Sequence, residues 1–272
     1  MRSNTHRCFA AERDQVDRPV SVPVYVINLA RSRDRWDRLK ASADEFSIDL
    51  RRVDAVEGKL LAPDELADFD EAGFRRCHGK IAMPAEIGCY FSHIRALEAI
   101  VQAAEPFAVI VEDDVLFTSA FQPLVSQLAG LNGWDAVKLV NHRTAAFRPF
   151  RALNGRFSVG RCMHGPLGSS AAYVVTREGA AKLLVAIRPM RVPYDVALER
   201  GWAGDYEIFT LDKPAVAFSD MAISTIAAGR STYAKSRLPA YKRISTLFFR
   251  STDYVRRIAY ALSRKSLKED KM

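Results

Sequence analysis

Residues 22–29 read V-P-V-Y-V-I-N-L, a continuous apolar run that is rich in β-branched residues. Such a run is typical of a strand buried on both faces of a parallel sheet. Ser32 follows in the position of an N-cap, and apolar side chains then recur at helical spacing over residues 33–46, which predicts a helix. Residues 48–55 predict a second strand. The order strand, helix, strand predicts an α/β fold.

The rest of the chain continues this alternation. Helices are predicted over 63–72, 84–104, 122–131 and 176–187, with a short one opening at 193–195, and strands over 107–111, 136–140, 170–175, 206–211 and 215–218. Residues 141–168 are rich in Arg, Gly and aromatics and are expected to be irregular. The polar, aperiodic residues 1–21 predict a flexible leader before a body that spans 22–229.

Composition limits the class of protein. The chain has 272 residues, 49% of them apolar and 26% charged, which excludes disorder over its whole length. No run approaches the roughly 18 apolar residues of a membrane span, and the N-terminus has no apolar segment typical of a secretory signal. Four scattered cysteines without a C-x-x-C pair indicate a reduced, cytosolic compartment.

The net charge of +8 belongs to the C-terminal tail. Residues 230–272 hold 12 Lys and Arg against 3 Asp and Glu, so the rest of the chain is near neutral and predicts no nucleic-acid-binding surface. Within this tail, arginines recur every seven residues beside an apolar stripe: Arg243, Arg250, Arg257 and Arg264 beside Ile244, Leu247, Phe248, Val255, Ile258 and Leu262. This basic amphipathic helix either lies on an anionic membrane surface or docks on the body with its charges solvated.

The triplet Glu112-Asp113-Asp114 directly follows the apolar run 107–111. Ligands in open α/β sheets bind beyond the carboxyl ends of strands. Adjacent carboxylates repel one another unless a cation lies between them, so the triplet predicts a divalent-metal site. Taken alone, it is equally compatible with a solvated acidic turn.

Several motifs stand in one order along residues 24–229: V-I-N-L at 26–29 with Arg31, Arg35 and Arg38, A-E-I-G-C-Y-F-S-H at 85–93, V-E-D-D at 111–114, G-S-S-A-A-Y at 168–173 and P-Y-D at 193–195. In this order the chain resembles glycosyltransferase family 25, which includes bacterial lipooligosaccharide galactosyltransferases and a domain of collagen galactosyltransferases. The resemblance implies a GT-A-like fold, a UDP-sugar donor, an Mn²⁺ or Mg²⁺ cofactor and sugar transfer to a saccharide such as lipopolysaccharide core.

The resemblance also suggests roles for single residues. Asp114, with Glu112 or Asp113, would hold the metal ion. The nucleotide sugar would lie against the end of the first strand and against residues of four later segments: Ile27, Asn28, Leu29, Arg35, Glu86, His93, Glu112, Asp113, Gly168, Ser169 and Ser170. Structural alternatives stay open for several of these, since Glu86 and His93 share one helical face with Cys89 or Tyr90 and could simply be buried and hydrogen-bonded.

Asp195 is the predicted general base of an inverting transfer, because one carboxylate must accept the proton of the attacking hydroxyl. Its position at the start of a helix predicts a lowered pKa, and a plain capping role is the alternative. His142, His164 and Asp220 are candidates for a third metal ligand.

The sequence thus predicts a cytosolic, metal-dependent hexosyltransferase held on the inner membrane, with a lipid-linked saccharide as acceptor. A non-catalytic basic adaptor for a membrane or nucleic acid would leave the acidic triplet unexplained. A nucleotidyltransferase is disfavoured because neither G-x-x-x-x-G-K-[ST] nor G-x-G-x-x-G occurs.

Overall fold

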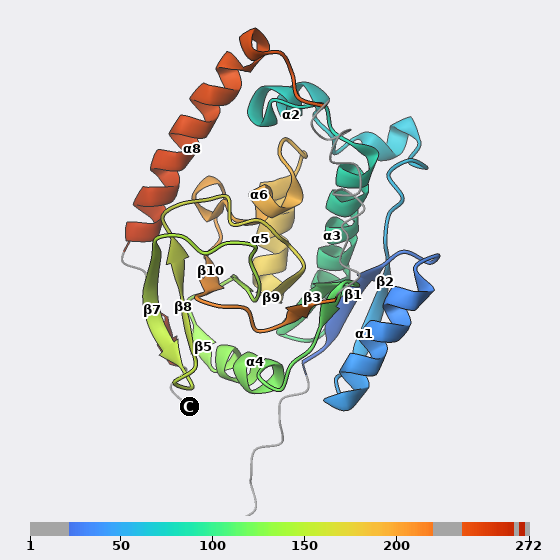
Figure 1. Cartoon of the computed structure of the whole chain (residues 1–272), viewed down its shortest axis with the longest axis vertical. Helices are drawn as coiled ribbons and strands as arrows, with labels where there is room; N and C mark the ends of the chain where they lie inside the picture. Colours follow the sequence, from blue (N-terminus) through green and yellow to red (C-terminus); the bar gives the residue numbers. More distant parts are fainter. Residues whose placement is uncertain (1–21, 220–235, 264–266, 270–272) are drawn as a thin grey trace, which may run out of the picture.

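The computed structural model describes residues 22–219, 236–263 and 267–269 (Figure 1). The predicted leader, residues 1–21, and residues 220–235, which include Asp220, lie outside this part. The core is an eight-stranded mixed sheet in the order β2-β1-β3-β9-β6-β10-β8-β7. Its strands are β1 (Val24–Asn28), β2 (Leu50–Asp54), β3 (Phe107–Glu112), β6 (Ala136–Lys138), β7 (Phe147–Leu153), β8 (Phe157–Cys162), β9 (Ala172–Thr176) and β10 (Ile208–Leu211).

The order of the strands confirms the predicted α/β fold. β1 runs parallel to both β2 and β3, so the carboxyl ends of these three strands meet at one edge of the sheet. β9 is antiparallel to β3 and β6, which makes the sheet mixed. Two small pairs extend it: β4 (Val115–Leu116) with β11 (Ala217–Phe218), and β5 (Leu131–Asn132) with β12 (Lys268–Glu269).

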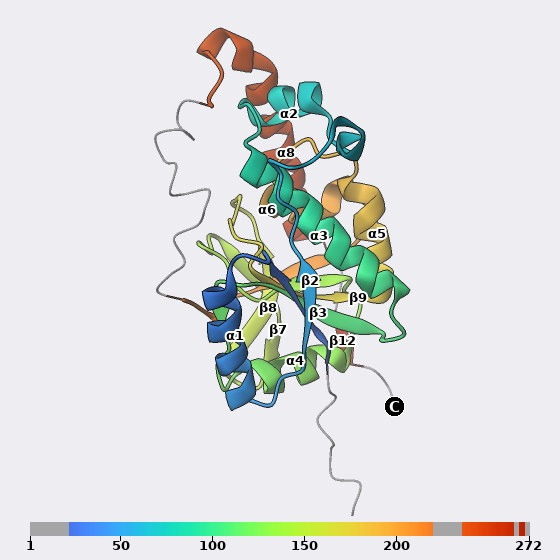
Figure 2. The same cartoon turned by 90° about the vertical axis from the view of Figure 1, so that its right-hand side faces the viewer.

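Helices cover both faces of the sheet (Figure 2). On one face, α1 (Arg33–Glu45) and α4 (Phe121–Ala129) pack over Val24 and Val26 of β1. On the other, α3 (Pro84–Gln102), α5 (Arg177–Ile187) and α6 (Tyr194–Leu198) pack over Tyr25 and Ile27. Because successive side chains of a strand point to opposite faces, the wholly buried β1 contributes to two separate cores.

The helix predicted over residues 63–72 is partly wrong. A 3-10 helix η1 (Pro63–Leu66) ends before Asp70, and α2 (Glu71–His78) begins after it. The Asp70 carboxylate accepts a hydrogen bond of 2.7 Å from the Gly73 amide and therefore caps α2. Asp70 thus starts a new helix near the end of the predicted one, and this new helix continues beyond it.

Residues 141–168 are also more regular than predicted. β7 and β8 form an antiparallel hairpin, whose turn contains Asn154 and Gly155 at φ 43° and 64°. An Asn-Gly pair with positive φ at both residues is a strong hairpin signal that sequence reasoning missed.

The predicted C-terminal helix is present as α8 (Ile244–Leu262), preceded by the 3-10 helix η4 (Ala240–Arg243). α8 lies along one side of the molecule and packs against α2, β8 and the 3-10 helix η2 (Gly201–Ala203) (Figure 1). The described part of the basic tail is therefore packed against the body.

Candidate active site

A pocket of about 250 Å³ opens at the carboxyl ends of β1 and β3. Its walls come from the start of α1, the loop after β2, the start of α3 and the acidic triplet. It includes seven of the predicted site residues, among them Ile27, Leu29 and His93. Beyond these, the structure adds lining residues that the sequence did not single out: Ala55, Val56, Glu57, Gly58, Lys59, Pro84 and Ser92.

The loop at 55–59 lies close to α3, held by a side chain of this helix and by close approach of the two backbones. The Ser92 hydroxyl accepts a hydrogen bond of 2.8 Å from the Val56 amide, and it donates one of 2.6 Å to the Gly88 carbonyl. A Cβ atom at Gly88 would lie 2.5 Å from the Val56 carbonyl oxygen, and one at Gly58 would overlap the Pro84 carbonyl oxygen. These two glycines let the loop close one side of the pocket. Their spacing forms no recognisable sequence motif.

The carboxylate of Asp113 is bound by two predicted site residues. The buried Asn28 donates a hydrogen bond of 2.7 Å from Nδ2 to Asp113 Oδ2. Arg35 Nη1 lies 3.0 Å from Asp113 Oδ1 and forms an ion pair with it. Both carboxylate oxygens of Asp113 thus have partners within the protein.

Asp114 has a different environment. Its Oδ1 atom is buried and has no hydrogen-bond partner among the described residues. Burial, together with the neighbouring charges of Glu112 and Asp113, raises the pKa of Asp114 to about 7. A buried carboxylate with an unpartnered oxygen and two acidic neighbours is what a divalent cation would stabilise.

Glu112 lies in a hydrogen-bonded network. Its Oε1 atom accepts a hydrogen bond of 2.8 Å from the Ser170 hydroxyl and lies 3.4 Å from His93 Nε2. Burial alone would raise the pKa of Glu112, but the hydrogen bonds and nearby charges outweigh it and lower this pKa. His93 is fully buried, with Nδ1 3.2 Å from the Tyr173 hydroxyl and its ring stacked on Tyr194 at 3.9 Å between centroids.

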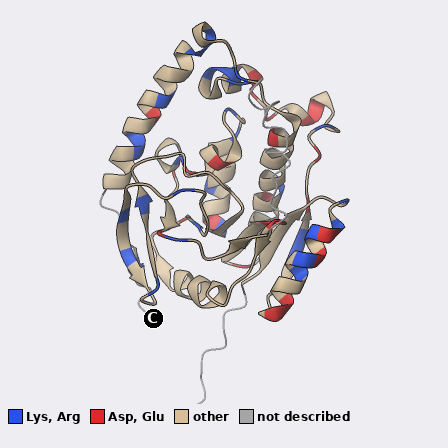
Figure 3. Ribbon diagram, viewed as in Figure 1, with Lys and Arg blue, Asp and Glu red and all other residues tan. Residues whose placement is uncertain are grey.

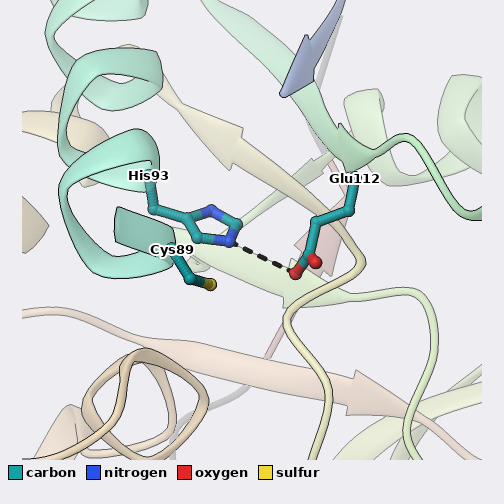
Figure 4. Close-up of side chains that lie close together, drawn as sticks. All are labelled: Cys89, His93 and Glu112. Atoms are coloured by element: carbon teal, nitrogen blue, oxygen red, sulfur yellow. Dashed lines mark hydrogen bonds and ion pairs between the residues drawn. The ribbon is translucent and has the colours of Figure 1, made fainter. Parts of the chain in front are cut away.

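Cys89 joins His93 and Glu112 in one cluster (Figure 4). The two α3 residues are four positions apart, so both point toward the end of β3. One ligand atom from each of the three side chains lies within 4.8 Å of the others. The sequence placed Cys89 on this helix face without giving it a role, although the spacing Cys-x-x-x-His already indicated a shared direction.

Asp195 begins α6, as predicted, and lies outside the residues that line the pocket. Burial, with the nearby charge of Glu199, raises its pKa. The expected lowering by the helix N-terminus is therefore wrong, since the Val196 amide only partly offsets burial. The charge of Glu112 also raises the pKa of Asp195, and the charges of Glu112 and Asp195 both raise the pKa of Cys89, so Asp195 lies near these two residues of the site.

Glu86 has a structural contact that the sequence left open. Its Oε2 atom accepts a hydrogen bond of 2.8 Å from the Met83 amide at the start of α3. Glu86 is buried and does not line the pocket, whereas its neighbours Pro84 and Ala85 do. Burial raises the pKa of Glu86.

Gly168, Ser169 and Ser170 do not line the pocket, and this loop contacts the site through the hydrogen bond from Ser170 to Glu112. Gly168 and Ser169 have φ of 72° and 66°, a left-handed turn that favours glycine at its first position. Glu199 holds this loop, because both of its carboxylate oxygens lie 3.0 Å from the Leu167 amide. The buried Lys138 donates to Glu199 over 2.8 Å and to the Gly168 carbonyl over 3.2 Å.

The two histidine candidates for a third metal ligand lie in different parts of the structure. His164 bonds the Tyr254 hydroxyl of α8 at 2.6 Å and stacks on its ring, so it faces α8. His142 stacks on Phe218, which pairs with Val115 next to the triplet. The Ser219 amide donates to the Asp114 carbonyl over 2.8 Å, which brings the chain to Asp114 one residue before Asp220.

A mixed, helix-flanked sheet with acidic residues at the carboxyl end of a central strand defines a GT-A-like glycosyltransferase fold. The family model described as Glycosyltransferase family 25 (LPS biosynthesis protein) matches residues 21–198, and the chain belongs to this family.

The chain is similar to other members of this family, which include a galactosyltransferase and a protein named inactive. Procollagen galactosyltransferase 1-B of Xenopus laevis is 29% identical over 178 residues, which are 60% of this chain and 28% of the relative. Inactive glycosyltransferase 25 family member 3 of Homo sapiens is 30% identical over 177 residues, which are 62% of this chain and 29% of the relative. The match spans less than a third of the length of these relatives.

Proposed function

We propose that the protein transfers a hexosyl group, such as galactose or glucose, from a UDP-sugar to a lipid-linked saccharide such as lipopolysaccharide core. The observation that carries this proposal is the difference in environment between two acids of the triplet, Asp113 and Asp114. Asp113 is satisfied by Asn28 and Arg35, whereas Asp114 has a buried oxygen, beside Glu112 in the pocket, that no described residue contacts by a hydrogen bond.

Glu112 and Asp114 are the proposed ligands of Mn²⁺ or Mg²⁺. Hard divalent cations prefer oxygen ligands, and they keep open positions for substrate phosphates. When bound, the ion would neutralise charge on the diphosphate leaving group. The Cys89, His93 and Glu112 cluster is a softer ligand set that would favour zinc, and it competes for the same Glu112 carboxylate.

The proposed reaction proceeds with inversion. The acceptor hydroxyl oxygen bonds to the anomeric carbon while the bond from that carbon to the UDP oxygen breaks, and Asp195 accepts the hydroxyl proton. A raised pKa makes the Asp195 carboxylate a stronger base than an exposed aspartate, which supports this role. Ile27 and Leu29 at the end of β1 offer an apolar surface for the uracil ring.

The test is UDP release from a panel of UDP-sugars with and without Mn²⁺ and truncated lipopolysaccharide acceptors. We expect one donor to be used only with metal and acceptor present, and Cys89→Ser to retain this Mn²⁺ dependence. If no UDP-sugar is turned over under any of these conditions, the proposed function is wrong. If Cys89→Ser abolishes the metal dependence while Asp114→Asn keeps it, the metal belongs to the other cluster.

A further inference from the structure

α8 docks on the body through its polar side. Thr246, Arg257 and Ala261 are buried, and the Thr246 hydroxyl donates to the Arg76 carbonyl over 2.9 Å. Asp253 Oδ1 accepts hydrogen bonds of 2.9 and 2.8 Å from Arg200 and Trp202. Arg257, predicted to belong to a solvated or membrane-facing basic stripe, instead points inward and lies 3.0 Å from Glu199.

The opposite side of α8 is apolar and open to solvent. Its large side chains are between half and four-fifths exposed: Ile244 70%, Leu247 64%, Phe248 78%, Val255 65% and Leu262 51%. Positions 244, 248, 255 and 262 follow one line along the helix, and Leu247 adjoins it. The residues between them on this side, Ser251 and Ala259, carry no charge. We call these seven residues the outer face of α8.

Exposed cations lie beside the outer face on one edge and at its start. Arg256 is exposed and lies about 120° from Ile244 around the helix. Lys242 is exposed just before the helix begins. Arg250 belongs to the body side, since its guanidinium donates a hydrogen bond of 3.0 Å to the His78 carbonyl, and Asp253, the acid within α8, also faces the body. Figure 3 shows basic residues at intervals along an otherwise mainly uncharged helix.

We propose that the outer face of α8 binds the surface of an anionic phospholipid membrane, with the helix lying in the membrane plane. An exposed apolar stripe with cations beside it is the pattern of such interfacial helices. No helix in the described part of the chain is long and apolar enough to cross a bilayer, so contact through one face is the geometry this surface allows. This would hold the protein on the cytoplasmic side of the inner membrane.

A second copy of the chain fits this surface less well. Two outer faces packed together would place Arg256 at the border of the contact in both copies, and Asp253, the acid within α8, faces the body instead. Like charges at the border of an apolar contact oppose association, whereas anionic headgroups would pair with Arg256 and Lys242. Charge complementarity therefore favours a lipid surface.

The test is co-sedimentation of the full chain with vesicles of phosphatidylcholine, with or without 30% phosphatidylglycerol. We expect binding to the anionic vesicles, at least about tenfold weaker binding for the double variant Leu247→Ser/Phe248→Ser, and weakening of wild-type binding by added salt. Val185→Ser is the matched control, since Val185 on α5 is 80% exposed and lies outside the outer face.

Two further measurements keep the result interpretable. The double variant should keep the unfolding temperature of the wild type, because the replaced side chains contact mainly solvent, and it should keep transfer to a soluble acceptor if the proposed function holds. Absence of binding to anionic vesicles, or equal binding by the double variant, would overturn the proposal. So would a wild-type dimer that the double variant dissociates, because the outer face would then pair two copies.

Discussion

Three consecutive acids, Glu112, Asp113 and Asp114, have three different environments. Asp113 is bound by Asn28 and Arg35, Glu112 lies against His93 and Ser170, and Asp114 has an oxygen without a partner among the described residues. The same residue type therefore serves as a structural anion in one position and as a candidate metal ligand in the next. The surrounding hydrogen-bond donors decide the difference, and these come from β1, α1, α3 and the loop before β9.

Asp114→Asn should abolish metal-dependent transfer and also make the metal-free protein more stable. The pKa of this carboxyl is raised from 3.8 to about 7, so ionisation is resisted in the folded state. The contribution of this carboxyl to the free energy of unfolding is therefore fully present at low pH, where the carboxyl is neutral. It is lost as the pH rises through about 7. Because the carboxyl is partly exposed, we expect a gain of about 1 kcal/mol at pH 8 from the substitution, and none near pH 4.

Denaturant unfolding in the presence of a chelator, at pH 4 and pH 8, measures this gain. Asp64→Asn, on the exposed 3-10 helix η1, is the control and should change neither stability nor transfer. A variant at Asp114 that is less stable than the wild type at pH 8 would show that the carboxylate is satisfied by the protein itself.

Asp195→Ala should lower kcat by about a hundredfold or more, the contribution of a positioned base, and leave donor affinity nearly unchanged. Calorimetric titration with the donor and turnover measurements separate the two effects. Because burial raises the Asp195 pKa, wild-type kcat should fall as the pH is lowered through that value. The exposed Asp205→Ala is the control, and a large loss of donor affinity at unchanged kcat would make Asp195 a donor ligand instead.

At the scale of elements, Glu199 joins three segments of the fold. It follows α6, accepts the Leu167 amide of the loop that leads to Ser170, and pairs with Arg257 of α8 and Lys138 of β6. All three charged side chains are at least nine-tenths buried. One carboxylate oxygen of Glu199 pairs with Lys138 and the other with Arg257, so α8 contributes to the environment of a loop that contacts the candidate active site.

Arg257→Ala should lower the free energy of unfolding by about 3 kcal/mol, because it leaves part of a buried carboxylate unpaired. Arg256→Ala, one residue earlier and exposed, should change it by less than about 0.5 kcal/mol. Chemical denaturation of both variants provides the comparison. Equal effects would mean that the Arg257–Glu199 pair adds little to the docking of α8.

The elements found from sequence alone are those with a strong period or an apolar run. β1, α1, β3, α3 and α5 all lie where they were predicted, since burial on the sheet dictates their patterns, and α8 was found from its amphipathic period. The β7–β8 hairpin was missed because β7 mixes arginines with aromatics and because Arg161 of β8 is buried only against distant parts of the chain: it donates to the Tyr260 carbonyl of α8 over 3.0 Å. The same holds for Lys138 and Glu199, which pair across 61 positions. No local pattern predicts such partners.

At the scale of the whole molecule, the C-terminal segment completes both cores. Phe249 and Tyr260 of α8 pack against the core on the α3 side, and Leu267 belongs to the core on the α4 side. Removal of residues 240–272 should therefore yield a chain that is poorly soluble or unfolds without a cooperative transition, as circular dichroism during heating would show. A soluble, active fragment of residues 1–239 would show that α8 is a dispensable appendage.

Because Glu199 ties three segments together, none of them can open without exposing the same buried carboxylate. Amide hydrogens in the 165–168 loop, at the end of α6 and in the second half of α8 should therefore exchange with deuterium as one cooperative unit. Their protection should fall at the same denaturant concentration, although these stretches are up to about ninety residues apart in the chain. In Arg257→Ala the unit should divide, with α8 exchanging first and the loop following.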